Sequence, residues 1–306
     1  MKTTLPLLTI LVGSSFLPLM AELKSGPPLP HHLVKDWAQL PKGYNFGECS
    51  GVDVDKQGNV WVFNRGAWPL IQFDKTGKML QAWSEETIRV KSAHGVRVDP
   101  DGNLWCADVK GHTLIKLSPT GRVLMVLGRT AGDNKSKDAF NEPTGFAFTS
   151  DGGFYVSDGY VNQRVIQFSK AGEYIRHWGE KGTADGQFNL VHDVVLDPQG
   201  RVYVADRTNA RIQIFTPEGK FIGKWTDIGN PWGLAYAAKE NAIYMADGAN
   251  NRVVKLNMDG QVLGVLGSYG KVQGKFDFAH NIAVDQEGSI YVVEIKNWRV
   301  QKFAKQ

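Results

Sequence analysis

The stretch GVRVDPDGNLWCAD, residues 95–108, decides the fold because its pattern recurs along the chain. An alternating apolar run leads into the polar turn Asp-Pro-Asp-Gly, and a second apolar run ends in an acid. Alternation with a period of two predicts β-strands, and the turn residues predict a hairpin between them. Six copies of this unit begin near Ser50, His94, Thr144, His192, Trp232 and His280. An internal repeat at this spacing indicates a modular architecture.

Two further apolar runs follow the hairpin and complete the unit. Third runs occupy residues 113–118, 164–169, 211–216 and 252–257, and fourth runs occupy residues 122–128, 173–179 and 220–225. No segment has the 3.6-residue period that a helical solenoid needs. Four strands per unit and six units predict an all-β fold, a six-bladed β-propeller.

The two ends of the chain predict how the ring closes. The sixth copy stops after its third run, RVQKF at residues 299–303. The missing fourth run matches the N-terminal segment LVKDWAQLP, residues 33–41, which resembles the fourth runs of other copies. We therefore expect this segment to pair with the last copy and to cover an otherwise open strand edge.

The extreme N-terminus has the pattern of a secretory signal. Lys2 precedes an apolar run from Leu5 to Met20, and Ala21 is a plausible cleavage point. We predict a signal peptide over residues 1–21 and one propeller domain over residues 22–306, with a retained membrane anchor as the alternative. The protein is then expected to be secreted or periplasmic.

Charge and cysteine content limit the expected partners. The net charge of +4 is not gathered into runs of lysine or arginine, so no nucleic-acid partner is expected. No later stretch is long and apolar enough to span a membrane, so no membrane partner is expected either, and we expect a monomer. Export would permit a disulfide between Cys49 and Cys106, but two separate buried thiols are favoured.

Three histidines share one position in the repeat. His94, His192 and His280 begin the first strand of copies two, four and six. If the first strands are innermost, these blades are roughly 120° apart and the imidazoles can converge on the central axis. A single buried histidine is usually a core residue, but three in alternate copies favour a metal site with an open fourth position. Imidazole suits zinc best, and copper, iron and nickel remain alternatives.

The same end of the propeller should carry Arg65, Tyr160 and Arg207, because each closely follows the end of a second strand. They are candidate functional residues, although an arginine in a loop is usually solvated and a tyrosine usually packs. The acids at the second-strand ends are predicted to cap turns by accepting backbone N–H bonds. These acids are Asp108, Asp158, Asp206 and Asp247.

The repeats resemble NHL repeats, and the site resembles that of the peptidyl-α-hydroxyglycine α-amidating lyases, over about residues 50–303. The segments that carry this resemblance are HGVRVDPDGNLWCADV at 94–109, VSDGYVNQRVIQFSKAGEY at 156–174 and VYVADRTNARIQIF at 202–215. The resemblance implies that zinc is held by the three histidines, that Tyr160 is the catalytic tyrosine, and that Arg65 and Arg207 are active-site arginines. It implies cleavage of the C–N bond of a small anionic N-acyl- or peptidyl-α-hydroxyglycine to an amide and glyoxylate.

The resemblance also implies a calcium ion bound by the carbonyls of Val52 and Val96 and by the side chain after the third histidine. That residue is Asn281, whereas the family has an aspartate there, so calcium binding stays open. A noncatalytic NHL propeller that binds a protein or glycan partner is the alternative function. Another lyase or hydrolase on the same scaffold is a third, because fold does not determine function.

Overall fold

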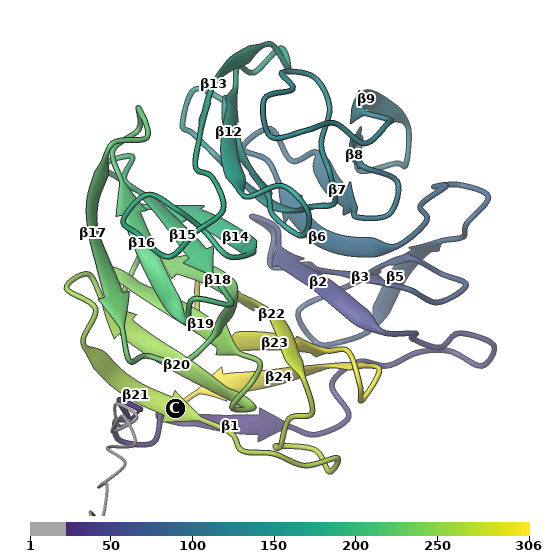
Figure 1. The fold of residues 1–306 in the computed structure, drawn as a ribbon. Helices are drawn as coiled ribbons and strands as arrows, with labels where there is room; N and C mark the ends of the chain where they lie inside the picture. Colours follow the sequence, from purple (N-terminus) through teal and green to yellow (C-terminus); the bar gives the residue numbers. More distant parts are fainter. Residues whose placement is uncertain (1–22) are drawn as a thin grey trace, which may run out of the picture.

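The computed structural model describes residues 23–306, and their regular structure consists of strands alone. These strands form six four-stranded sheets around a central axis (Figure 1). The predicted all-β, six-bladed propeller is thus confirmed, whereas the expected signal peptide lies outside the described residues. Within residues 23–306 there is no helix of the length and hydrophobicity needed to cross a bilayer.

Each blade is a meander whose first strand is innermost (Figure 1). Blade one contains β2 (Cys49–Val54), β3 (Val60–Asn64), β4 (Leu70–Phe73) and β5 (Met79–Trp83). Blade two contains β6 (Ala93–Val98), β7 (Leu104–Asp108), β8 (Thr113–Leu117) and β9 (Val123–Gly128). Blade three contains β10 (Pro143–Phe148), β11 (Phe154–Asp158), β12 (Arg164–Phe168) and β13 (Tyr174–Trp178).

The second half of the ring repeats this arrangement. Blade four contains β14 (Val191–Leu196), β15 (Val202–Asp206), β16 (Arg211–Phe215) and β17 (Phe221–Thr226). Blade five contains β18 (Pro231–Ala237), β19 (Ala242–Asp247), β20 (Arg252–Asn257) and β21 (Val262–Leu266). Blade six contains β22 (Ala279–Val284), β23 (Ile290–Glu294), β24 (Arg299–Lys305) and β1 (His31–Val34).

The ring closes through the N-terminal segment, as predicted, but the strand is displaced from residues 33–41 to residues 31–34, so only Leu33 and Val34 belong to both. β1 pairs antiparallel with β24, with Leu33 opposite Phe303. The strand ends at Val34 because Asp36 adopts a positive φ of 49°. Trp37 then leaves the sheet and packs edge-on against Tyr291, at 5.1 Å between ring centroids. The last blade is therefore completed by the first strand, and residues 35–41 run on toward blade one.

The core lies between neighbouring blades. Trp105 of blade two, for example, packs 4.6 Å from the ring of Phe154 in blade three. Cys49 and Cys106 are buried in two different clusters of this core, and both are free thiols. The expectation of two separate thiols is therefore confirmed.

A polar side chain at the end of each second strand holds the loop that precedes the first strand of the same blade by a hydrogen bond. In all six blades it accepts a hydrogen bond from a backbone N–H 17 residues earlier. In blades three to six an arginine at the start of the third strand also pairs with it. The residues are Asn64, Asp108, Asp158, Asp206, Asp247 and Glu294. The prediction that the acids cap turns is confirmed, so we assign these acids a role in the fold and none in the chemistry.

Candidate metal centre

A bulge at the start of every innermost strand sets the side chains that face the axis. The register between the first and second strands shifts at the same point in all six blades: the pairing skips one residue of the first strand in five blades and two, His94 and Gly95, in blade two. Such a bulge bends the strand and redirects the unpaired side chain. The residues freed in this way are Ser50, His94, Thr144, His192, Trp232 and His280.

Each histidine is oriented by the blade that follows it. The Nδ1 atoms of His94 and His192 lie 2.7 Å from the Thr144 carbonyl oxygen and 2.6 Å from that of Trp232. His280 Nδ1 lies 2.7 Å from the carbonyl oxygen of Ser50. Since a carbonyl only accepts, each Nδ1 carries the proton and donates it. Every Nε2 is therefore unprotonated and carries a lone pair, in the tautomer that a metal ligand requires.

The three imidazoles meet on the axis. Their potential ligand nitrogens lie within 4.8 Å of one another, close enough for one ion to engage all three after small side-chain rotations. Burial is the main reason that the pKa of His94 and His192 is well below the usual value, and it lowers the pKa of His280 to about 3. The rings are therefore neutral near pH 7. A buried set of three neutral imidazoles fits zinc.

Tyr160 stands beside this centre. Its hydroxyl oxygen lies 3.3 Å from His94 Nε2 and 3.2 Å from His192 Nε2. Gly159 allows the close approach, because a Cβ there would lie 1.7 Å from the Val191 carbonyl oxygen. Burial raises the pKa of Tyr160, while the charges of Arg207 and Arg65 oppose the rise. Among protein groups alone the phenol is thus protonated.

The two predicted arginines flank the tyrosine differently. The guanidinium carbon of Arg207 lies 4.1 Å from the ring centroid of Trp232 and 5.5 Å from that of Tyr160, so its charge faces two aromatic rings. Arg65 donates from Nη1 to Glu48 at 2.6 Å and from Nε to the Ala93 carbonyl at 3.1 Å. The structure therefore brings Tyr160, Arg65 and Arg207 to the histidine end of the axis.

Two aromatic residues of the site were not predicted as functional. Trp232 lies 5.0 Å from His192 and 5.6 Å from His280 between ring centroids, and Phe278 packs edge-on against it at 4.5 Å. Trp232 occupies, in copy five, the position that the histidines have in copies two, four and six, so the repeat alignment could have predicted that it lies at the site. Phe278 sits two residues before His280 at a positive φ of 69°, and no pattern in the sequence marks it.

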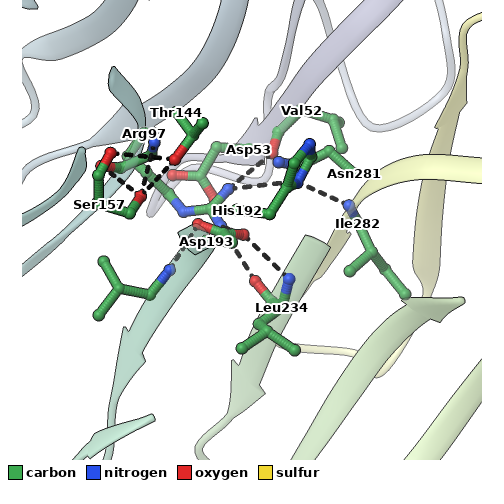
Figure 2. Close-up of polar contacts among 12 residues, drawn as sticks. Val52, Asp53, Arg97, Thr144, Ser157, His192, Asp193, Leu234, Asn281 and Ile282 are labelled. Carbon is green, nitrogen blue, oxygen red and sulfur yellow. Dashed lines mark hydrogen bonds and ion pairs between the residues drawn. The ribbon is translucent and has the colours of Figure 1, made fainter. Parts of the chain in front are cut away.

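The predicted calcium ligands come together around an arginine. The carbonyl oxygens of Val52 and Val96 and the amide oxygen of Asn281 lie 3.3 to 3.4 Å from Nη1 of Arg97. Figure 2 shows Arg97 with Val52 and Asn281. A guanidinium carries its own positive charge and fills the space among these oxygens. With the guanidinium in this place the arrangement does not fit a calcium ion, a question that the sequence left open.

Comparison with known proteins agrees with the resemblance. The NHL repeat model matches residues 140–168 and 188–215. Peptidyl-glycine alpha-amidating monooxygenase A of Xenopus laevis is 32% identical over 195 residues, which make up 59% of this chain and 21% of that protein. Peptidyl-alpha-hydroxyglycine alpha-amidating lyase 1 of Drosophila melanogaster is 28% identical over 189 residues, 54% of this chain and 35% of that protein.

One further relative is named for the repeat alone, and a solved structure shares the fold. NHL repeat-containing protein 3 of Homo sapiens is 33% identical over 180 residues, 54% of this chain and 50% of that protein. A streptogramin B lyase structure superposes with a TM-score of 0.63 over 86% of this chain and 95% of that one, at 12% identity, which shows a common fold. This chain covers about a fifth to a half of the length of these sequence relatives.

Fold and site together define a six-bladed propeller with a three-histidine centre on its axis. The chain carries NHL repeats and has homologues named peptidyl-alpha-hydroxyglycine alpha-amidating lyase, as the sequence resemblance predicted.

Proposed function

We propose that this chain is an exported zinc-dependent lyase that cleaves the C–N bond of a small anionic N-acyl- or peptidyl-α-hydroxyglycine. The products are an amide and glyoxylate. The observation that carries the proposal is the position of the Tyr160 hydroxyl, within hydrogen-bonding distance of two of the three converging histidine nitrogens. An acid–base group thus stands beside a metal-binding set, and the homology to proteins named as amidating lyases supports the reaction class.

The histidines, the two arginines and Tyr160 each have a different role in the proposed reaction. Zinc bound by the three histidines would act as a Lewis acid and make a substrate hydroxyl more acidic. Arg207 and Arg65 offer guanidinium groups, which pair well with the substrate carboxylate. As a phenolate, the form that the positive charges of bound zinc, Arg207 and Arg65 would favour, Tyr160 Oη would take the hydroxyl proton and return it to the departing nitrogen. The carbon–oxygen double bond of glyoxylate forms as the C–N bond breaks, so the proton moves from oxygen to nitrogen and every atom is accounted for.

The cellular setting is part of the proposal. The apolar pattern of residues 1–21 supports export, so the enzyme would be secreted or periplasmic. It would act as a monomer on a small-molecule or peptide substrate, without a nucleic-acid or membrane partner.

Turnover by the Tyr160→Phe variant tests the proposal. The substitution keeps the ring and removes the hydroxyl, so glyoxylate release from an α-hydroxyhippurate substrate should fall about 10²-fold at matched zinc content. Comparable rates for the two proteins would remove Tyr160 from the mechanism. No turnover by the zinc-loaded wild type on several acyl variants would reject the lyase assignment.

A noncatalytic propeller that binds a protein or glycan is the second candidate. It is favoured by the similarity to NHL repeat-containing protein 3, whose name records repeats and no reaction. In that case His94, His192 and His280 would hold a structural metal, and Tyr160→Phe would leave partner binding unchanged.

A further inference from the structure

The residues that directly follow the bulged positions of the six innermost strands pack closely around the axis. This residue is glycine in four blades, namely Gly51, Gly95, Gly145 and Gly233, and a polar residue in two, namely Asp193 and Asn281. A Cβ on Gly145 would lie 2.5 Å from Asp193 Oδ1, and a Cβ on Gly233 would lie 2.6 Å from the Asn281 Cα. Gly145 and Gly233 therefore leave space for Asp193 and Asn281 in the middle of the molecule. Gly51 and Gly95 instead allow a close approach of neighbouring backbone, because a Cβ there would lie 2.6 Å from the His94 carbonyl oxygen and 2.5 Å from that of Thr144.

Arg97 reaches into the same space from β6 (Figure 2). Its Nη2 donates to Asp193 Oδ2 at 2.9 Å and to the Leu234 carbonyl at 3.0 Å. Its Nη1 donates to the three oxygens described above, from Val52, Val96 and Asn281. The acceptors come from blades one, two, four, five and six, so one guanidinium touches nearly the whole ring.

These contacts lie next to the metal centre in the sequence as well as in space. Asp193 follows His192, Asn281 follows His280, and Arg97 is three residues after His94 on the same strand. The Asp193 side chain is only 2% exposed, and its other bonds are to the backbone N–H groups of Val194 and Leu234. A carboxylate buried so deeply requires a positive charge beside it, and Arg97 supplies one.

We propose that Arg97 is a positioning residue that serves as a fixed internal cation on the propeller axis. It gathers the strands that carry all three histidines in the way that a bound divalent ion gathers oxygen ligands, and it makes the protein independent of calcium. The inference concerns the histidine centre and does not rest on the lyase reaction.

The site of Arg97 is reachable from the face opposite the histidines. A cavity of about 240 Å³ lies at the far end of the innermost strands, and Asp53 and Arg97 are among its lining residues. If the arginine side chain is removed, a small ion can therefore enter from solvent. It would meet the Asp193 and Asp53 carboxylates and several carbonyl oxygens, which is a ligand set that calcium favours.

Thermal unfolding of Arg97→Ala with zinc held saturating gives the first test. In calcium-depleted buffer the variant should melt roughly 10 °C below the wild type, because a buried carboxylate loses its partner. Adding calcium should restore at least half of that loss and leave the wild type unchanged. Arg97→Met fills the volume without a charge, so it should melt low with or without calcium.

Cobalt(II) binding separates positioning from general stability. Cobalt occupies three-histidine sites and reports their geometry through its visible absorption. The cobalt affinity of Arg97→Ala should fall about 10-fold, the usual scale for losing a group that orients ligands, and should recover with calcium. Arg201→Ala, which removes the partner of the buried Asp197 carboxylate in the turn between β14 and β15, should bind cobalt like the wild type.

Several outcomes would overturn the proposal. Calcium could raise the melting temperature of the wild type, calcium could fail to restore Arg97→Ala, or Arg97→Ala could bind cobalt with unchanged affinity and spectrum. If Arg97→Ala does not fold, Arg97→Lys decides the matter: it keeps the charge without the planar fork. It should fold and bind cobalt more weakly than the wild type, and a wild-type affinity would reject the positioning role.

Discussion

At the scale of single residues, the centre depends on carbonyl groups as much as on imidazoles. Thr144, Trp232 and Ser50 each present a backbone oxygen to the histidine of the preceding blade. A blade without a histidine thus orients the histidine of its neighbour. This division explains why alternate blades are sufficient for a threefold set of ligands.

Removal of one histidine should abolish tight metal binding. In His192→Ala the other two imidazoles remain, but two ligands hold zinc far more weakly than three, so the metal should be lost on dialysis. Elemental analysis of the purified protein measures this directly. The matched control is His177→Ala on β13, outside the centre, which should keep its metal. Equal metal content in His192→Ala and the wild type would place the metal elsewhere.

Some residues of the centre could be predicted from the sequence and others could not. The shared position of His94, His192 and His280 in the repeat was sufficient to predict their convergence, because a ring converts equal register into equal distance from the axis. Arg97 could not be predicted in the same way. Within GVRVD it has the appearance of the polar member of an alternating strand, and its five acceptors come from parts of the chain that only ring closure brings together.

At the scale of elements, the inner strands are defined by their bulges. The bulge adds one unpaired residue. Side chains that would share a face of a regular strand therefore point to opposite faces when one lies before the bulge and the other after it. Sequence alternation alone placed the strands correctly but did not reveal this shift. The bulge is what turns His192 and Trp232 toward the axis at the point where the pairing skips from Val191 to Asp193 and from Pro231 to Gly233.

A carboxylate in the turn between β18 and β19 joins blades five and six. Glu240 pairs with Lys255 of β20 and, at 2.6 Å, with Lys305 of β24. Burial alone would raise the pKa of Glu240, but hydrogen bonds from the two lysines and Tyr244 outweigh it and lower the pKa to about 2.

Glu240→Gln should therefore change the acid stability of the protein. The folded pKa of about 2 lies below the ordinary value of 4.5, so Glu240 stabilises the fold fully above pH 4.5, and this contribution is lost as the pH falls toward 2. The melting temperatures of wild type and variant should differ most above pH 4.5 and converge toward pH 2. Glu173→Gln, in an exposed turn, is the control. A difference that is constant across this pH range would contradict the assignment.

At the scale of the whole molecule, the ring is held shut by the pairing of β1 with β24. The segment before β1 adds to this closure, because Leu29 is buried and its N–H bonds to the Val265 carbonyl of blade five at 2.9 Å. Residues near the N-terminus thus contact both of the last two blades.

A chain that begins at Lys35 should lose this closure. Without β1 the edge of β24 is exposed, and we expect a fall of roughly 10 °C in melting temperature together with aggregation. Calorimetry and light scattering compare it with a chain that begins at Leu23. Equal melting temperatures and equal solubility would show that the ring is held by contacts elsewhere.

The same pairing determines the order in which the molecule can be assembled. His31 pairs with Lys305, so β1 cannot complete blade six until β24, more than 260 residues later, has been synthesised. Closure entropy grows slowly with loop length, by about 0.6 kcal/mol for each doubling, so the wait costs little at equilibrium, but long-range pairing is slow. Until it occurs, β24 can accept the equivalent strand of another copy equally well. Refolding from concentrated solution should therefore yield strand-exchanged dimers, whereas refolding from dilute solution yields single rings.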